Sequence, residues 1–333
     1  LVIVGGSDAP ITPEVMEGFR TMGALAEDQD VAALDAIAEA NLRRTSRPFS
    51  TNCGFTMGEA SQWIVLASDE LALKLGAQIH AAVPGVFVNA DGHKKSISAP
   101  GIGNYITLAK AAALTESMLG SQSLQQRSCV QAHGTSTPQN RVTESHVLNQ
   151  TAKAFAIEDW KVGAVKAYLG HSQGTAGGDQ LAVSLGLWRY GILPGIATID
   201  HVADDVHASH LSIQAQHHEL GTQGIDTVLL NSKGFGGNNA SAVLMGPHIA
   251  LQLMTKKHGT KAMTALALAQ EKPAAVAAEY DTQAMRGQTQ PTYKFGHNVL
   301  AGEDLSLGRH EIRIPGYAQA VDLSVSNPFD DMC

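Results

Sequence analysis

The chain has 333 residues, of which 44% are hydrophobic and 16% are charged, and its formal net charge is −8. This composition provides enough apolar material for one large domain or two ordinary ones, and it excludes a disordered chain. The negative balance gives no electrostatic reason to expect nucleic acid or an anionic membrane as a partner.

The three cysteines, Cys53, Cys129 and Cys333, have a spacing that fits neither a metal-binding knuckle nor a disulfide framework. A reducing cytoplasm is therefore the expected location. The sequence has no signal peptide and no apolar run long enough to cross a bilayer, so we expect no membrane association.

The N-terminal part predicts alternating strands and helices. The apolar run Leu1–Val4 predicts a buried strand, and because a mature protein rarely begins inside a core strand, we expect a fragment or a processed chain. Thr12-Pro13-Glu14 has the order of an N-cap, a first-turn proline and an acidic first turn, which predicts a helix to about Ala26. Next come a helix at 31–41, a strand at Gln62–Ser68, a helix at Glu70–Leu75 and a strand at Gln78–Val83.

The middle of the chain continues this alternation after a long polar loop, Asn89–Tyr105, of a length typical of functional loops. The expected elements are a helix at Thr107–Leu119, a strand at Arg127–Gln131, a helix at Val142–Phe155, a strand at Val162–Val165, a helix at Gly174–Gly191 and a strand pair at Thr227–Asn231 and Ala240–Met245. This order favours an α/β layered fold with mostly parallel strands. Residues 247–333 differ in composition from the preceding strands and helices, and we interpret them as a C-terminal extension.

Four short motifs carry the candidate chemistry. Two histidines, His133 in HGTST and His171 in KAYLGH, directly follow strands, and the ends of such strands are where ligands bind in α/β sheets. Two neutral imidazoles that converge on one carbonyl can stabilise a developing oxyanion. Lys166 can add positive potential or hold a histidine, and the glycine turn around Phe235 presents backbone N–H groups. The fourth motif, GTAGG at Gly174–Gly178, opens a helix.

Each motif taken alone has an ordinary structural explanation. A single histidine is more often a surface or core residue, a GFGG turn is common in hairpins, and a lone lysine is usually solvated. The ordered set, with one strand–helix–strand unit between its members, is much harder to obtain by chance.

In this order and spacing, the chain resembles the second half of the β-ketoacyl synthases of the thiolase-like superfamily. His133 and His171 match the two histidines of that family, Lys166 its lysine, and Phe235 its gating phenylalanine, while Glu144 matches an acidic residue that organises the site. Upstream, SRPF and GFTMGE resemble further family stretches, and the similarity runs from Leu1 to Met245. The long loop and the tail resemble the larger bacterial members.

The resemblance implies an α/β, five-layered α-β-α-β-α fold. Residues 1–75 would be the end of the first half, residues 76–246 the complete second half, and residues 247–333 an extension. The family nucleophile, a cysteine at the start of a buried helix, would lie upstream of Leu1, since none of the three cysteines matches it. We therefore expect a missing N-terminal segment to accompany this chain, and the fragment alone to be inactive.

The resemblance also implies a β-ketoacyl-acyl-carrier-protein synthase of fatty acid synthesis, an acyltransferase that condenses malonyl and acyl thioesters with loss of CO₂. The expected partner is acyl carrier protein, whose phosphopantetheine arm would contact Thr135 and Thr137, and Gly236 is expected to bind substrate as well. No metal and no other cofactor is expected, and the family is usually homodimeric.

Two other interpretations remain open. A non-catalytic thiolase-like partner, such as a chain-length-determining subunit, would keep the fold without the nucleophile, although the retained histidines and lysine count against it. A nucleotide-binding module is disfavoured, because no glycine-rich phosphate motif lies between a strand and a helix.

Overall fold

The computed structural model describes residues 1–95, 101–290, 295–297 and 299–332. Part of the predicted loop Asn89–Tyr105, residues 96–100, therefore lies outside the described residues, as does Cys333. The chain divides into two compact units, residues 1–274 and residues 275–333. All the predicted site residues belong to the first unit.

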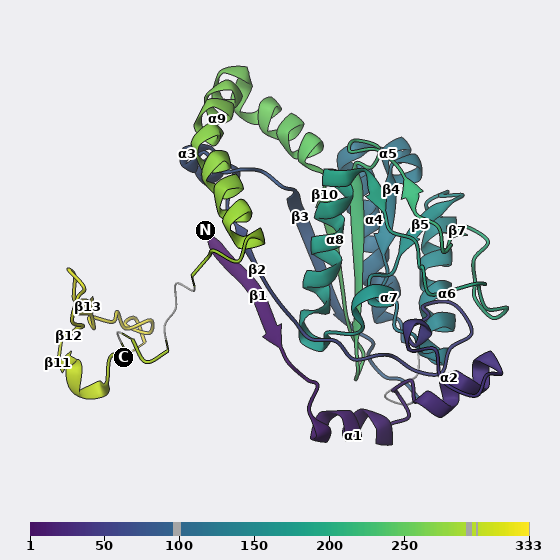
Figure 1. Cartoon of the computed structure of the whole chain (residues 1–333). Helices are drawn as coiled ribbons and strands as arrows, with labels where there is room; N and C mark the ends of the chain where they lie inside the picture. The colour runs from purple at the N-terminus through teal and green to yellow at the C-terminus, as the bar shows by residue number, and fades with distance from the viewer. Residues whose placement is uncertain (96–100, 291–294, 298, 333) are drawn as a thin grey trace. The chain divides into compact units, whose positions relative to one another are not determined.

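A six-stranded mixed sheet forms the centre of the first unit (Figure 1). Its strands, in spatial order, are β3 (Ala82–Ala90), β10 (Asn238–Met245), β9 (Thr227–Gly234), β4 (Ser128–Gln131), β5 (Trp160–Gly163) and β7 (Leu211–Ser212). The pairs β3–β10 and β10–β9 are antiparallel, whereas β9–β4, β4–β5 and β5–β7 are parallel. The predicted α/β class is confirmed, but the sheet is mixed rather than mostly parallel, because the β9–β10 hairpin and β3 add antiparallel strands at one edge.

Helices cover both faces of this sheet. Successive residues of a strand point to opposite faces, so each strand contacts the helices on both sides. On β4, Val130 packs in a cluster with Leu108 of α4 (Gly103–Leu119) and Leu148 of α6 (Pro138–Ala154). The neighbouring Cys129 instead packs in a second cluster with Leu187 of α8 (Ala176–Tyr190). These strands are apolar on both faces, which is typical of a fully buried sheet.

A two-stranded antiparallel ribbon lies against the other side of α8. It is formed by β1 (Val2–Asp8) and β2 (Ala60–Leu66), and Gln62 of β2 hydrogen-bonds Asp179 of α8. The predicted strand at the N-terminus is therefore present, but the prediction that it is buried is wrong, since Ile3 is 61% exposed. The ribbon has only two strands, and no described element covers its outer face.

Shorter elements connect these layers. They are α1 (Pro13–Thr21), α2 (Asp28–Asp35), η1 (Leu42–Arg44), α3 (Asp69–Leu75), α5 (Ser121–Gln126), α7 (Lys166–Leu169), η2 (Gln173–Thr175), β6 (Ile192–Leu193) and β8 (His218–Glu219). The predicted cap of α1 is present, since the Thr12 hydroxyl accepts from the Val15 amide at 3.4 Å. The helix ends before the predicted Ala26, because Gly23 adopts a left-handed conformation with φ of +63°.

The helix α9 (Pro247–Met285) begins the predicted extension and is interrupted at Gly259, where φ is 79° and ψ is 161°. Residues up to 274 belong to the first unit. The second unit contains η3 (Gly302–Asp304) and a small antiparallel sheet of β11 (Ser306–Leu307), β12 (Glu311–Arg313) and β13 (Val321–Asp322). None of the described helices is long and apolar enough to cross a membrane.

Candidate active site

His133 is held at the end of β4 by a turn that requires glycine. Gly134 has φ of +57°, and a Cβ there would lie 2.9 Å from Cβ of Ala164. The His133 amide donates to Glu144 Oε1 at 2.7 Å, and the Gly134 amide donates to Glu144 Oε2 at 2.8 Å. Glu144, on α6, therefore fixes the backbone that carries the imidazole.

Glu144 is completely buried and accepts two further hydrogen bonds, from Asn140 Nδ2 and Asn231 Nδ2, each at 2.8 Å. Four donors saturate a buried carboxylate, which would otherwise be strongly destabilising in the protein interior. The carboxylate thus connects α6, β9 and the His133 turn.

His171 approaches from the next strand–helix connection. It follows α7 and Gly170, and its amide donates to the Thr56 carbonyl at 2.7 Å. Its Nδ1 accepts from the Gln173 amide at 3.1 Å, so the neutral ring carries its proton on Nε2. Nε2–H is therefore available as a donor to a substrate.

The two imidazoles meet edge to face, with ring centroids 5.2 Å apart and planes at 83°. In the described part of the chain, neither ring nitrogen of His133 has a hydrogen-bond partner, and Nδ1 is buried. Buried Lys166 donates from Nζ to the His133 carbonyl. Two predicted histidines and the predicted lysine therefore lie together.

The surroundings keep both rings uncharged. Burial, with a contribution from Lys166, lowers the pKa of His171 to about 3, and burial together with Lys166 lowers the pKa of His133 well below its ordinary value. Burial also lowers the pKa of Lys166 to about 8, against the opposing effect of Glu144 and Asp179. A pair of neutral imidazoles donates hydrogen bonds without carrying charge of its own.

Both histidines line a cavity of about 620 Å³, which also includes Thr135, Thr137 and Phe235. Phe235 lies at the tip of the β9–β10 hairpin and is 54% exposed, and its ring centroid lies 6.2 Å from that of Phe19 of α1, with the two planes tilted by 32°. Gly236 has φ of +84° and is exposed, but it does not line the cavity. The cavity thus combines two histidines, two threonine hydroxyls and an aromatic side chain at one mouth.

Residues 80–200 match the family model described as "Beta-ketoacyl synthase, C-terminal domain". This stretch of the chain is similar to the C-terminal domain of the beta-ketoacyl synthases. The matched residues include His133, His171 and Lys166, and Phe235 follows them in the turn between β9 and β10.

One curated relative is similar to this chain over the whole length of the chain. Beta-ketoacyl-[acyl-carrier-protein] synthase FabY of Pseudomonas aeruginosa is 48% identical over 332 residues, covering 100% of this chain and 52% of the relative. A 3-oxoacyl-[acyl-carrier-protein] synthase 2 of Synechocystis is 30% identical over 241 residues, 72% of this chain and 53% of the relative. The chain therefore spans about half the length of these relatives.

Solved ketosynthase structures match the fold. The crystal structure of the noncanonical ketosynthase FabY from P. aeruginosa has a TM-score of 0.89 at 48% identity, covering 100% of this chain and 52% of that one. A beta-ketoacyl synthase from Burkholderia phymatum, at 24% identity, has a TM-score of 0.58 over 73% of this chain and supports the fold alone. The thiolase-like assignment is confirmed.

The sequence pattern missed several cavity residues of the ketosynthase site. Lys233 immediately precedes the glycine turn and lines the cavity, together with Asp91, Lys94, Asn104 and Asn140. A lysine near the end of a strand has no pattern that separates it from a solvated surface lysine. Its partners come from α6, about ninety residues earlier, so only the fold brings them together.

None of the described cysteines lines the cavity. Cys129 is buried in the sheet, where burial raises the pKa of its thiol to about 12. Burial likewise raises the pKa of the Cys53 thiol, so a smaller fraction of it is ionised to the reactive thiolate at neutral pH. Both thiols have the environment of structural cysteines.

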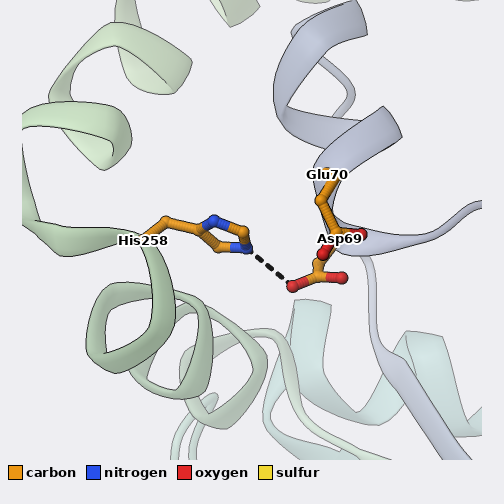
Figure 2. A group of neighbouring side chains, drawn as sticks. All are labelled: Asp69, Glu70 and His258. Carbon is orange, nitrogen blue, oxygen red and sulfur yellow. Dashed lines mark hydrogen bonds and ion pairs between the residues drawn. The ribbon is translucent and has the colours of Figure 1, made fainter.

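A separate cluster of titratable groups, Asp69, Glu70 and His258, joins α3 to α9 (Figure 2). His258 Nε2 lies 2.6 Å from Asp69 Oδ2, and Lys257 Nζ lies 2.7 Å from the same oxygen and 2.5 Å from Glu70 Oε1. Hydrogen bonds from Lys257 and His258 hold the pKa of Asp69 well below its usual range. Because the Lys257 ammonium group forms an ion pair with both carboxylates, the cluster links the two helices.

Proposed function

We propose that the protein containing this chain is a β-ketoacyl-acyl-carrier-protein synthase that condenses malonyl and acyl thioesters in fatty acid biosynthesis. The observation that carries the proposal is the pair of neutral imidazoles, with ring centroids 5.2 Å apart, facing one cavity. A malonyl thioester oxygen bound between His133 and His171 would receive two N–H donors as it gains negative charge.

In the condensing half-reaction, the bond between the malonyl methylene and its carboxylate breaks. The electron pair moves to the thioester oxygen as an enolate, and CO₂ leaves. The enolate carbon then attacks an acyl thioester held on a cysteine outside this chain, a carbon–carbon bond forms, and the cysteine thiolate leaves. The backbone N–H of Phe235 is proposed to hold the tetrahedral oxyanion.

Other residues are assigned supporting roles. Lys166 and Glu144 position the His133 segment through the hydrogen bonds described above. Thr135 and Thr137, whose hydroxyl oxygens lie 3.3 Å apart, face the proposed path of the phosphopantetheine arm of acyl carrier protein. Gly236 would contribute the flexibility of the Phe235 turn, through which Phe235 gates the entry of the two substrates. The enzyme is proposed to work as a cytoplasmic homodimer that needs no metal or other cofactor.

The test is product formation by the full-length protein. Incubation with acyl-carrier and malonyl-carrier thioesters should give, by mass spectrometry, an acyl chain lengthened by two carbons and bearing a β-keto group. A non-catalytic partner subunit would give no such product at any enzyme concentration, and that result would overturn the proposal.

A further inference from the structure

The side chain of Lys233 reaches into the same cavity as the histidine pair. Its Nζ lies 3.2 Å from Asn140 Oδ1 and 3.2 Å from Thr143 Oγ1, both near the start of α6. Both of these oxygens are uncharged, and among the described residues no carboxylate forms an ion pair with this ammonium group. The ammonium group of Lys233 is thus held at the cavity wall by two neutral oxygens, without a direct carboxylate partner among the described residues.

An ammonium group has three N–H donors, and two of those of Lys233 have partners. The third is available to a molecule in the cavity. Lys94, which also lines the cavity, already pairs with Asp91 at 3.1 Å, so it does not present the same unneutralised charge. Burial is the main cause of the lowered pKa of His133, Lys166 and His171 add to it, and Lys233 makes a smaller contribution in the same direction.

We propose that Lys233 binds the free carboxylate of the malonyl-type thioester while His133 and His171 bind its thioester oxygen. The inference rests on the proposed function and assigns to one residue the recognition of the extender substrate. In a malonyl thioester, only one methylene separates the carboxylate from the thioester carbonyl, so both groups must be held in one cavity. A charge-assisted hydrogen bond from an ammonium group is the natural partner for such a carboxylate.

The contact acts on the substrate before reaction. During decarboxylation the negative charge leaves the carboxylate for the thioester oxygen, so the ammonium–carboxylate contact weakens as the transition state forms. Loss of such a contact raises KM for the extender without lowering kcat. The acyl thioester that supplies the primer has no free carboxylate and should be unaffected.

A purely structural role for Lys233 makes a different prediction. If it only fastens Asn140 and thereby Glu144 behind His133, its removal would disturb the imidazole. Decarboxylation would then fall in kcat. The division of the effect between KM and kcat separates the two roles.

The experiment compares full-length wild type with Lys233→Met and with the matched control Lys161→Met, which removes a lysine outside the cavity. For Lys233→Met, KM for decarboxylation of malonyl-N-acetylcysteamine should rise by about 10- to 100-fold with kcat maintained. Acyl transfer from butyryl-N-acetylcysteamine should be unchanged, which also shows that the variant is folded. Lys161→Met should match wild type in both assays.

Calorimetric binding of sulfoacetyl-N-acetylcysteamine, whose sulfonate cannot leave as CO₂, separates the inference from the proposed function. Wild type should bind it more tightly than the acetyl analogue, and Lys233→Met should lose that preference. If wild type shows the preference but releases no CO₂ from the malonyl thioester, the proposed function fails while the role of Lys233 stands. An absent preference in wild type, an unchanged preference in the variant, or parallel losses on malonyl and butyryl substrates would overturn the inference.

Discussion

The chemistry at the centre of the site depends on imidazoles that stay neutral. Burial lowers the pKa of both His133 and His171, and the nearby Lys166 ammonium opposes protonation further. Glu144 lies next to the His133 backbone, and its two carboxylate oxygens accept hydrogen bonds from amide groups rather than from the imidazole. The site can consequently offer uncharged N–H donors to an anion that develops during the reaction.

The lowered pKa of His171 predicts a stability that decreases in acid. Between its ordinary value and about 3, the unfolded chain binds a proton at His171 that the folded protein does not bind, so the free energy of unfolding rises with pH across this window. His171→Asn should reduce the slope of unfolding free energy against pH by up to about 1.4 kcal/mol per pH unit. Urea unfolding of both proteins from pH 4 to pH 7 measures this slope, and parallel curves would contradict the assignment.

The saturated carboxylate of Glu144 predicts a large loss of stability on substitution. Glu144→Gln removes the charge and presents an amide nitrogen to donors that need an acceptor. The free energy of unfolding should fall by about 3 kcal/mol. The control is Glu158→Gln, at a side chain that is 82% exposed, and it should change stability by less than about 0.5 kcal/mol in the same chemical denaturation experiment. Equal effects of the two substitutions would show that the hydrogen bonds of Glu144 contribute little.

The proximity of His133, Lys166 and His171 could be predicted, because motifs that directly follow parallel strands lie at the same edge of a sheet. The contacts of Lys233 could not be predicted. Its neighbours Asn140 and Thr143 lie on α6, and they come close to Lys233 only because β4 pairs with β9 in the fold. The substrate contact predicted for Gly236 remains a prediction, and the structure places that residue at the exposed tip of the hairpin.

At the scale of elements, the alternation of strand and helix could be predicted in part because apolar runs mark buried strands, as at the start of β9 and the end of β10. The ends of the elements were predicted less well. The helix α4 begins at Gly103, ahead of the predicted Thr107, and β3 covers Ala82–Ala90, in place of the predicted Gln78–Val83, and enters the predicted loop. The burial of β1 could not be inferred from its apolar residues alone. Burial depends on what lies above a strand, and hydropathy does not report this.

The interruption of α9 at Gly259 predicts a specific sensitivity. With φ of 79° and ψ of 161°, this residue occupies a region accessible essentially only to glycine. Gly259→Ala should lower the free energy of unfolding by about 1–3 kcal/mol, although a Cβ there would meet open space. The matched control is Gly186→Ala in α8, where the Cβ also meets no atom; it should be neutral or stabilise by up to about 1 kcal/mol. Thermal melts of both variants that shift equally would contradict this account of the break.

At the scale of the whole first unit, the layers follow the order helices, sheet, α8 and ribbon. The outer side chains of the ribbon are apolar and exposed, among them Ile3, Trp63 and Val65 at 61%, 63% and 61% exposure. Monomeric proteins rarely leave such a continuous apolar strand pair uncovered. The expected five-layered fold places a further helical layer on this side, and the expected N-terminal segment remains the predicted source of that cover.

This exposed surface predicts association when the chain is produced alone. Light scattering of the 333-residue chain should show oligomers or aggregates at micromolar concentration, because unpaired edges and apolar faces associate. The double substitution Trp63→Lys and Val65→Lys should reduce the association, whereas Lys153→Glu on α6 should leave it unchanged. A monodisperse monomer in the unsubstituted chain would show that the ribbon needs no cover.

The most direct test of the account is CO₂ release from a malonyl-carrier thioester labelled at its free carboxylate, measured for the full-length protein and its His171→Ala variant. Loss of one oxyanion donor should reduce the release rate by about 100- to 1,000-fold, while transfer of an acyl group onto the enzyme persists. Undiminished CO₂ release by the variant would contradict the claim that the imidazole pair stabilises the enolate.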